Sequence, residues 1–259
     1  MRERILCFDI GNTDVYAGVF CGRELELEFR TSNRARPTVD EFGVFLLQVL
    51  QVRGIEIESI VNVAIASVVP DVLPTVVQAC EKYLGKRALV LQAGVKTGLK
   101  IRMKDPREVG ADRIANAMAA VEAYPGENLI VVDMGTATTF CAVSAQKEYL
   151  GGAISTGVGL SMNALATQTA KLPRVDIVRP ERALGKTTVE NMQSGLYWGQ
   201  VGLLKEIIGR LSKEAFGDEP VRVIGTGGMA RLFGQEAIFD VQKPALVLEG
   251  LLTAIKLNP

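Results

Sequence analysis

Two short stretches of the sequence repeat a residue pattern that could bind a phosphorylated ligand. The first is Asp9-Ile10-Gly11-Asn12-Thr13, and the second is Asp133-Met134-Gly135-Thr136-Ala137-Thr138. In both, an apolar run ends in Asp-x-Gly and small polar residues follow. Glycine lets the backbone approach a ligand, threonine hydroxyls and backbone N–H groups can contact phosphate, and aspartate can hold a cation. A single Asp-x-Gly is usually an ordinary turn, but its repetition favours a phosphate site.

A third glycine-rich stretch, Ile224-Gly225-Thr226-Gly227-Gly228, leaves a predicted strand and enters a predicted helix. Glycine there makes room for a flat ligand such as adenine. Together with the two Asp-x-Gly turns, this stretch is interpreted as the nucleoside end of an ATP cleft. Two other nucleotide motifs are excluded. Gly185-Lys186-Thr187 is not a P-loop because Pro180 stands where that motif needs glycine, and no GxGxxG opens a helix.

The chain contains no histidine, which excludes Ser-His-Asp catalysis, histidine-ligated zinc and a histidine base. A carboxylate is therefore the expected proton acceptor if the protein is an enzyme. Asp112, in Gly110-Ala111-Asp112-Arg113, begins a predicted helix. It could be a helix N-cap or a functional carboxylate in an accessible turn, with Arg113 to clamp a carboxylate or phosphate. The residues by themselves leave both readings open.

Composition predicts a globular protein with a substantial core. The chain has 259 residues, of which 48% are hydrophobic and 22% charged, and its 29 basic and 29 acidic residues balance. This balance gives no overall field that favours nucleic acid or an anionic membrane. No apolar run approaches the ~20 residues that span a bilayer, and the N-terminus lacks a signal-peptide core, so we expect a cytoplasmic location. The cysteines show no CxxC spacing and are predicted to be small buried hydrophobes: Cys7, Cys21, Cys80 and Cys141.

The hydrophobic pattern predicts two similar halves. In the first, strands are expected over 5–9, 15–20, 25–30, 61–69 and 88–92, and helices over 38–51 and 71–84. In the second, strands are expected over 128–133, 138–143, 147–154 and 221–225, and helices over 159–170, 188–211 and 244–256. Each half opens on a three-stranded meander with Asp-x-Gly in its first turn, which indicates an internal duplication. A helix over 112–124 carries the expected boundary, giving domains 1–118 and 119–259 whose two turns face one cleft.

Six motifs occur in the order found in type III pantothenate kinases, and the resemblance extends from residue 5 to about 255. They are Asp9–Thr13, Gly110–Arg113, Asp133–Thr138, Leu172-Pro173-Arg174-Val175, Thr188 with Ser194-Gly195, and Gly225–Gly228. The resemblance implies an α/β protein of the actin-like ATPase, acetate and sugar kinase superfamily. Two duplicated ribonuclease-H-like domains with mixed sheets would enclose an interdomain ATP cleft. The implied enzyme is a homodimer that phosphorylates pantothenate to 4′-phosphopantothenate, the first step of coenzyme A biosynthesis.

The resemblance also implies roles for individual residues. Asp112 would be the general base, and Asp133 would hold a monovalent cation, K⁺ or NH₄⁺, while Mg²⁺ accompanies ATP. The implied ATP-binding residues are Asp9, Ile10, Gly11, Asn12, Thr13, Thr136 and Gly227. The implied pantothenate-binding residues are Met103, Gly110, Ala111, Asp112, Arg113 and Thr188. Two places depart from the family pattern: Met103 replaces a common tyrosine, and Ile154-Ser155-Thr156-Gly157 replaces Ile-Ala-Pro-Gly.

Two other kinds of protein could share this fold. One is a non-catalytic regulatory relative, for instance an accessory transcription factor, which would not need the carboxylate at Asp112. The other is a phosphatase, or a kinase of another small hydroxylated substrate, which would use the same Asp-x-Gly turns with a different acceptor. Gly110–Arg113 separates these readings, because this stretch resembles the pantothenate branch specifically.

Overall fold

The computed structural model describes residues 2–33 and 36–259, which form two compact units. The first unit comprises Met1–Gly98, Asp105–Glu122 and Leu246–Pro259, and the second comprises Leu99–Lys104 and Ala123–Ala245. The units therefore cross the predicted boundary between residues 118 and 119, since the C-terminal segment belongs to the first unit. The two compact units are defined by contacts in space, whereas the predicted domains 1–118 and 119–259 divide the chain at one point in the sequence. That division stays a prediction.

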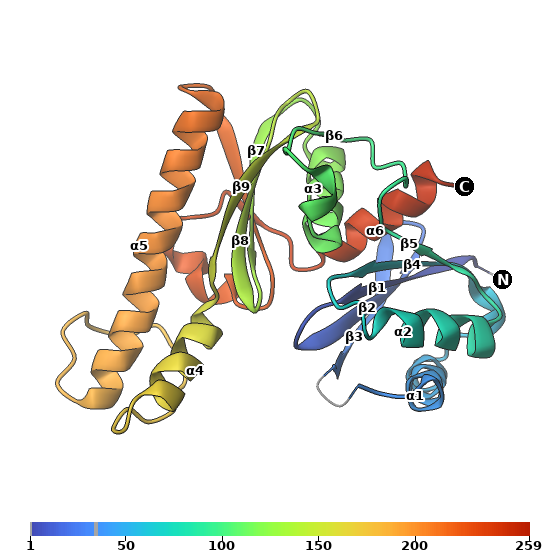
Figure 1. The fold of residues 1–259 in the computed structure, drawn as a ribbon, viewed down its shortest axis with the longest axis horizontal. Helices are drawn as coiled ribbons and strands as arrows, with labels where there is room; N and C mark the ends of the chain where they lie inside the picture. Colours follow the sequence, from blue (N-terminus) through green and yellow to red (C-terminus); the bar gives the residue numbers. More distant parts are fainter. Residues whose placement is uncertain (1, 34–35) are drawn as a thin grey trace. The chain divides into compact units, whose positions relative to one another are not determined.

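The first unit is built on a five-stranded mixed sheet (Figure 1). Its strands are β1 (Arg4–Ile10), β2 (Asp14–Cys21), β3 (Glu24–Ser32), β4 (Ile60–Ser67) and β5 (Ala88–Val90), in the order β3-β2-β1-β4-β5. β1, β2 and β3 form an antiparallel meander, whereas β4 runs parallel to β1 and β5 runs parallel to β4. The predicted three-stranded meander and the mixed character of the sheet are thus confirmed.

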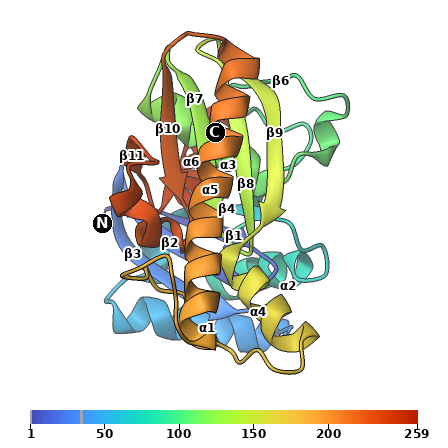
Figure 2. The ribbon, with the colours of Figure 1, turned by 90° about the vertical axis from the view of Figure 1, so that its left-hand side faces the viewer.

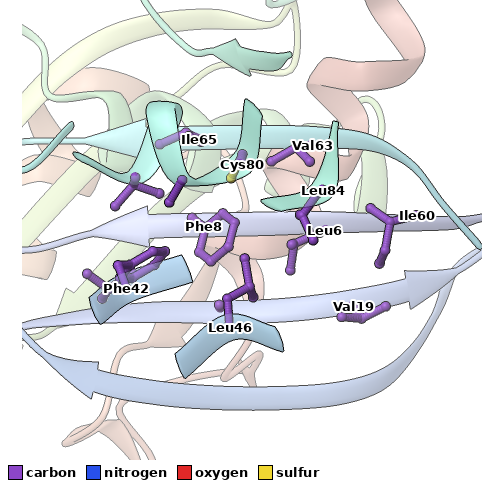
Figure 3. Packing of buried hydrophobic residues seen from close by; sticks show 14 of the residues in the cluster. Leu6, Phe8, Val19, Phe42, Leu46, Ile60, Val63, Ile65, Cys80 and Leu84 are labelled. Atoms are coloured by element: carbon purple, nitrogen blue, oxygen red, sulfur yellow. The ribbon is translucent and has the colours of Figure 1, made fainter. Parts of the chain in front are cut away.

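One face of this sheet packs against α1 (Val39–Val52) and α2 (Leu73–Ala79). Alternate residues of β1, among them Leu6 and Phe8, point to the side chains of Phe42 and Leu46 in α1 (Figure 3), as expected from the two-residue period of a strand. Thr38 caps α1 through a capping box with Glu41. The predicted helix 71–84 is α2 followed by a π-helical turn, Cys80–Leu84.

The other face of the first sheet packs against the C-terminal helix α6 (Leu246–Leu257). Gly18 on β2 leaves room for Leu248, because a Cβ at position 18 would lie 2.8 Å from Leu248 Cδ1. Gly250 lies against the backbone of Ala115 in α3 (Ala111–Ala123), and a Cβ at position 250 would collide with it. These glycines allow α6 to close the core of the first unit.

The second unit repeats the same strand order. Its strands are β6 (Lys100–Ile101), β7 (Asn128–Met134), β8 (Ala137–Val143), β9 (Glu148–Thr156), β10 (Val221–Thr226) and β11 (Val241–Gln242), in the order β11-β10-β7-β8-β9-β6. The run β9-β8-β7-β10-β11 matches β3-β2-β1-β4-β5 in order and direction, and β6 is added beside β9. The predicted duplication of a mixed α/β domain is therefore present in the topology.

Two helices, α4 (Val158–Gln168) and α5 (Thr188–Phe216), pack against the second sheet, and α5 crosses its face (Figure 2). Tyr197 of α5 stacks on Phe233 with ring centroids 5.0 Å apart. Phe233 lies in a 3-10 helix, Ala230–Glu236, where the sequence predicted a helix after Gly228. Short 3-10 helices over Ile57–Ser59 and Pro106–Glu108 were not predicted.

The four cysteines are free thiols. Cys7, Cys80 and Cys141 are buried as predicted, whereas Cys21 is only half-buried. Burial raises the pKa of the Cys80 thiol to about 12, so this side chain behaves as a hydrophobic group rather than a nucleophile. Among the helices of the described residues, none has the length and apolar character needed to cross a membrane.

Candidate functional site

The first Asp-x-Gly turn connects β1 to β2. The N–H of Gly11 donates to the carbonyl oxygen of Asp14 at 3.0 Å, which closes the turn Gly11–Asp14. Asn12 and Thr13, at the tip of this turn, are exposed, and Asp9 is half-buried. The turn therefore presents backbone groups and a hydroxyl at the carboxyl end of β1, which is where ligands bind in α/β sheets.

The second Asp-x-Gly turn connects β7 to β8 in the same way. The N–H of Gly135 donates to the carbonyl oxygen of Ala137 at 3.0 Å, so this turn is one residue shorter than Gly11–Asp14. Thr136 is exposed at its tip, and Asp133 is half-buried beneath it. The side chain at the tip again has a hydroxyl that could bind phosphate.

The two aspartates occupy equivalent places in their sheets. Asp9 lies beside Ala66 of the parallel neighbour β4, and Asp133 lies beside Thr226 of the parallel neighbour β10. Each precedes the final residue of its strand. The duplication thus brings one carboxylate to the same end of each sheet.

The backbone closes tightly around Asp133. Gly227 follows β10 with a φ of +87°, and a Cβ there would collide with Asp133 Oδ1 and with the backbone of Met134. Only glycine adopts this conformation without strain and leaves this space. A carboxylate oxygen in such a cradle fits a hard cation. Within the described residues, no group of three or more aspartate, glutamate, cysteine or histidine side chains could hold a metal ion.

Asp112 lies in the first turn of α3. The carbonyl oxygen of Gly110 accepts the N–H of Ile114 at 3.1 Å, so Gly110 holds the cap position. The N-cap reading of Asp112 is therefore wrong, because the capping carbonyl lies two residues earlier. Instead the Asp112 carboxylate accepts the N–H of Arg113 at 2.8 Å.

The Asp112 carboxylate is packed against Gly110, where a Cβ would collide with its Oδ1 and would lie 3.4 Å from Val68 Cγ1. Burial raises the pKa of Asp112, and the Arg113 N–H and guanidinium charge oppose this shift. Arg113 itself is 9% exposed. A carboxylate with a raised pKa next to a buried cation is typical of a functional site.

Among the other predicted substrate residues, Ala111 is half-buried and begins α3. Met103 follows β6 and lies next to β9, its Sδ 3.5 Å from where a Cβ of Gly151 would be. Thr188 is the exposed first residue of α5, whose N-cap is Thr187. The first unit contains the predicted residues Asp9, Ile10, Gly11, Asn12, Thr13, Gly110, Ala111, Asp112 and Arg113, and the second contains Met103, Asp133, Thr136, Thr188 and Gly227.

Two residues that the sequence did not assign to the site, Asn33 and Gly157, contact the Asp-x-Gly turns. The backbone N–H of Asn33 donates to the carbonyl oxygen of Thr13 at 3.1 Å, and that of Gly157 donates to the carbonyl oxygen of Thr136 at 3.1 Å. Each directly follows the third strand of its meander. Aligning the two duplicated halves of the sequence could have revealed both residues, because they occupy equivalent positions.

Comparison with known proteins identifies the family. Residues 5–210 match the sequence model of the family described as type III pantothenate kinase. A type III pantothenate kinase of Legionella pneumophila (strain Corby) is 48% identical over 254 residues, which cover 98% of this chain and 99% of that protein. Type III pantothenate kinase 2 of Francisella tularensis (strain SCHU S4) is also 48% identical, with the same coverage.

A solved structure shows the fold independently. A Sinorhizobium meliloti protein assigned as a 2-dehydro-3-deoxygalactonokinase superposes with a TM-score of 0.64 at 13% identity, over 97% of this chain and 96% of that one. At this identity the likeness establishes a shared fold and nothing about the substrate. The match over most of the chain, together with relatives of 48% identity over nearly its full length, decides the narrower assignment. The chain belongs to the type III pantothenate kinase family.

Proposed function

We propose that this protein transfers the γ-phosphoryl group of ATP to the hydroxyl of pantothenate, which gives 4′-phosphopantothenate in the first step of coenzyme A biosynthesis. Membership of the type III pantothenate kinase family supports this reaction. The observation that carries the proposal is the partly buried Asp112 carboxylate, held against Gly110 and beside Arg113.

Asp112 is the proposed general base. Phosphoryl transfer depends mainly on positioning and charge neutralisation, and an oriented carboxylate can take the hydroxyl proton as the transfer proceeds. Because burial raises the pKa of Asp112, its carboxylate accepts a proton more readily than an exposed aspartate would. The bond from the Arg113 N–H fixes the direction of this carboxylate.

The substrate is proposed to bind around Asp112. The planar guanidinium of Arg113 can bind the pantothenate carboxylate with two parallel hydrogen bonds. Gly110 and Ala111 leave the approach to Asp112 open, and Met103 and Thr188 complete the proposed set of substrate contacts. Methionine has no hydroxyl, so Met103 would supply an apolar wall.

ATP is proposed to bind through both Asp-x-Gly turns and the glycine-rich stretch after β10. In the first turn, the backbone from Asp9 to Thr13 and the Thr13 hydroxyl would contact the phosphates. In the second, the hydroxyl of Thr136 would do so, and Gly227 would leave space beside the nucleotide. Exposure of Asn12, Thr13 and Thr136 supports these contacts.

Two cations are proposed as cofactors. Asp133 would hold a monovalent cation, K⁺ or NH₄⁺, in the cradle formed by Gly227 and the Met134 backbone. Mg²⁺ would accompany ATP, with Asp9 facing it. When bound, these ions neutralise the charge of the phosphates, while the protein orients the acceptor hydroxyl and takes its proton at Asp112.

A homodimer is also proposed on the family resemblance, and a cytoplasmic location is proposed on the lack of an apolar run long enough to span a bilayer. The dimer can be checked by measuring the mass of the protein in solution. A mass corresponding to a single chain at micromolar concentration would contradict it.

The decisive experiment measures ADP release from ATP with and without pantothenate, and identifies the phosphorylated product by mass spectrometry. We expect ADP release to require pantothenate and to match product formation mole for mole. N-acetylglucosamine, which has hydroxyls but no carboxylate, is the matched control and should not stimulate ADP release. Stimulation by the sugar alone would support a kinase of another substrate, and no stimulation by either would support a regulatory relative.

A further inference from the structure

Asn33, the residue directly after β3, is attached to the first Asp-x-Gly turn at two points. Its side-chain Nδ2 donates to the carbonyl oxygen of Gly11 at 2.8 Å, and its backbone N–H donates to the carbonyl oxygen of Thr13 at 3.1 Å. Asn33 is only 5% exposed. An isolated turn at a strand end has few internal bonds, so these two contacts decide much of its conformation.

In the second unit, the position equivalent to Asn33 is occupied by a glycine, Gly157. Asp14 pairs with Ser32 and Ala137 pairs with Thr156, so the next residues, Asn33 and Gly157, correspond. A Cβ at Gly157 would collide with the carbonyl oxygen of Thr136, because the shorter second turn lies directly on this glycine. The longer first turn is supported instead by the Asn33 amide.

The orientation of the Asn33 amide follows from its neighbour. The carbonyl oxygen of Gly11 can only accept, so Nδ2 rather than Oδ1 must face it. The Oδ1 atom is buried and has no hydrogen-bond partner within the part of the chain that the structure describes. Burying an unpaired carbonyl oxygen costs free energy. The amide is present in spite of this cost, so its donor to the Gly11 carbonyl is what this position requires.

We propose that Asn33 is a positioning residue for ATP, which holds the Gly11–Thr13 backbone in the conformation that binds phosphate. In a trans peptide the C=O of one residue and the N–H of the next point in opposite directions. Holding the Gly11 carbonyl on the Asn33 side therefore turns the Asn12 N–H away from Asn33, and Asn12 is exposed at the tip of the turn. Asn33 thus orients a phosphate-binding N–H without touching the ligand.

This inference rests on the proposed function, and its test separates the two. In the full-length protein, Asn33→Ala removes the donor, and Asn33→Asp keeps the shape but replaces the donor with a charged acceptor. Loss of one orienting bond is expected to raise the KM for ATP roughly tenfold, with the KM for pantothenate unchanged. Asn33→Asp should be affected more than Asn33→Ala, because its carboxylate repels both the Gly11 carbonyl and the phosphates.

Asn128→Ala is the matched control. Asn128 is also a buried asparagine (8% exposed) whose amide bridges two segments, since Nδ2 donates to Glu219 at 2.7 Å and Oδ1 accepts the N–H of Ala145 at 3.0 Å. It lies at the start of β7, at the opposite end of that strand from Asp133. Its loss should lower the thermal midpoint without changing the KM for ATP.

Binding of a non-hydrolysable ATP analogue, measured by calorimetry without pantothenate, gives a readout independent of the acceptor. If Asn33→Ala binds the analogue more weakly than wild type does, the inference is supported. If the wild-type protein also shows no stimulation of ADP release by pantothenate, the proposed function is refuted while the inference stands. A normal KM for ATP and normal analogue binding in Asn33→Ala would overturn the inference. If Asn33→Ala does not fold, Asn33→Ser replaces it under the same criteria.

Discussion

The carboxylate of Asp112 occupies the space that a side chain at Gly110 would need, so a Cβ at position 110 would collide with Asp112 Oδ1. This contact, together with the Arg113 N–H at 2.8 Å, determines where the carboxylate points. Glycine at position 110 is therefore explained by the placement of Asp112 as well as by access for a substrate.

Gly110→Ala tests this relationship. The new methyl group should displace the Asp112 carboxylate, and a shift of about 1 Å in a catalytic group can cost on the order of 10²-fold in rate. We expect kcat to fall about 10- to 100-fold while ATP binding is retained, as measured by steady-state kinetics and calorimetry. The control is Gly209→Ala, an exposed glycine of α5 with no atom near its missing Cβ, which should leave kcat unchanged. Normal kcat in Gly110→Ala would contradict the role of this contact.

The raised pKa of Asp112 predicts a particular dependence on pH. Since burial disfavours the charged form, ionised Asp112 lowers the stability of the folded protein. Asp112→Asn should therefore be inactive yet at least as stable as wild type at pH 7. The difference in unfolding free energy should shrink as the pH falls through the folded pKa, and it should disappear below the unperturbed value of 3.8. Denaturant titrations at several pH values would measure it, and turnover by Asp112→Asn near the wild-type rate would rule out the base.

Ionisation of Asp40 should have the opposite effect on stability from ionisation of Asp112. Hydrogen bonds from Lys82 and Tyr83 lower the pKa of this exposed carboxyl, so its ionised form stabilises the fold above pH 3.8. Asp40→Asn should then be less stable than wild type at pH 7, and the two should converge as the pH falls below the folded pKa. Parallel behaviour of the two variants would refute the assigned causes.

The monovalent cation is tested at Asp133. Wild-type turnover should be several-fold faster in potassium or ammonium than in sodium at equal ionic strength, because a site of fixed size discriminates among cations. Asp133→Asn should lose most of this preference, because the amide oxygen carries no charge. Equal wild-type rates in the three salts would count against a cation at this position.

Gly227→Ala tests the cradle around Asp133 through stability alone. With φ at +87° and the Asp133 carboxylate in contact, alanine should cost about 2 kcal/mol or more of unfolding free energy. The neighbouring Gly228→Ala is the control, because no atom lies within 4 Å of its missing Cβ, and its stability should stay within about 0.5 kcal/mol of wild type. Equal stabilities would show that the backbone relaxes at position 227.

The elements that the sequence predicts well are those with a clear period or local cap. The apolar run of β1, which ends in Asp-x-Gly, and the capping box of Thr38 with Glu41 are local signals, and both strand and helix lie where expected. β6 and β11 have two residues each and exist only because they pair with distant strands. Their sequences contain no period to detect, so tertiary context alone produces them.

The residues of the candidate site also differ in how well the sequence predicts them. Asp-x-Gly and Gly110–Arg113 are contiguous motifs, so a single sequence reveals them. The contact between Asn33 and Gly11 spans 22 positions and depends on the first turn being one residue longer than the second. No local rule encodes such a contact, and only the superposition of two halves exposes it.

The contact between α6 and the first sheet determines the order in which the protein can fold during synthesis. Gly18 packs against Leu248, and Ala115 packs against Gly250, so the core of the first unit is incomplete until α6 has been synthesised. The second unit ends at Ala245 and has all of its residues earlier. Domains usually fold in order from the N-terminus during translation, but here the unit that begins the chain should be the last to acquire protection from proteolysis.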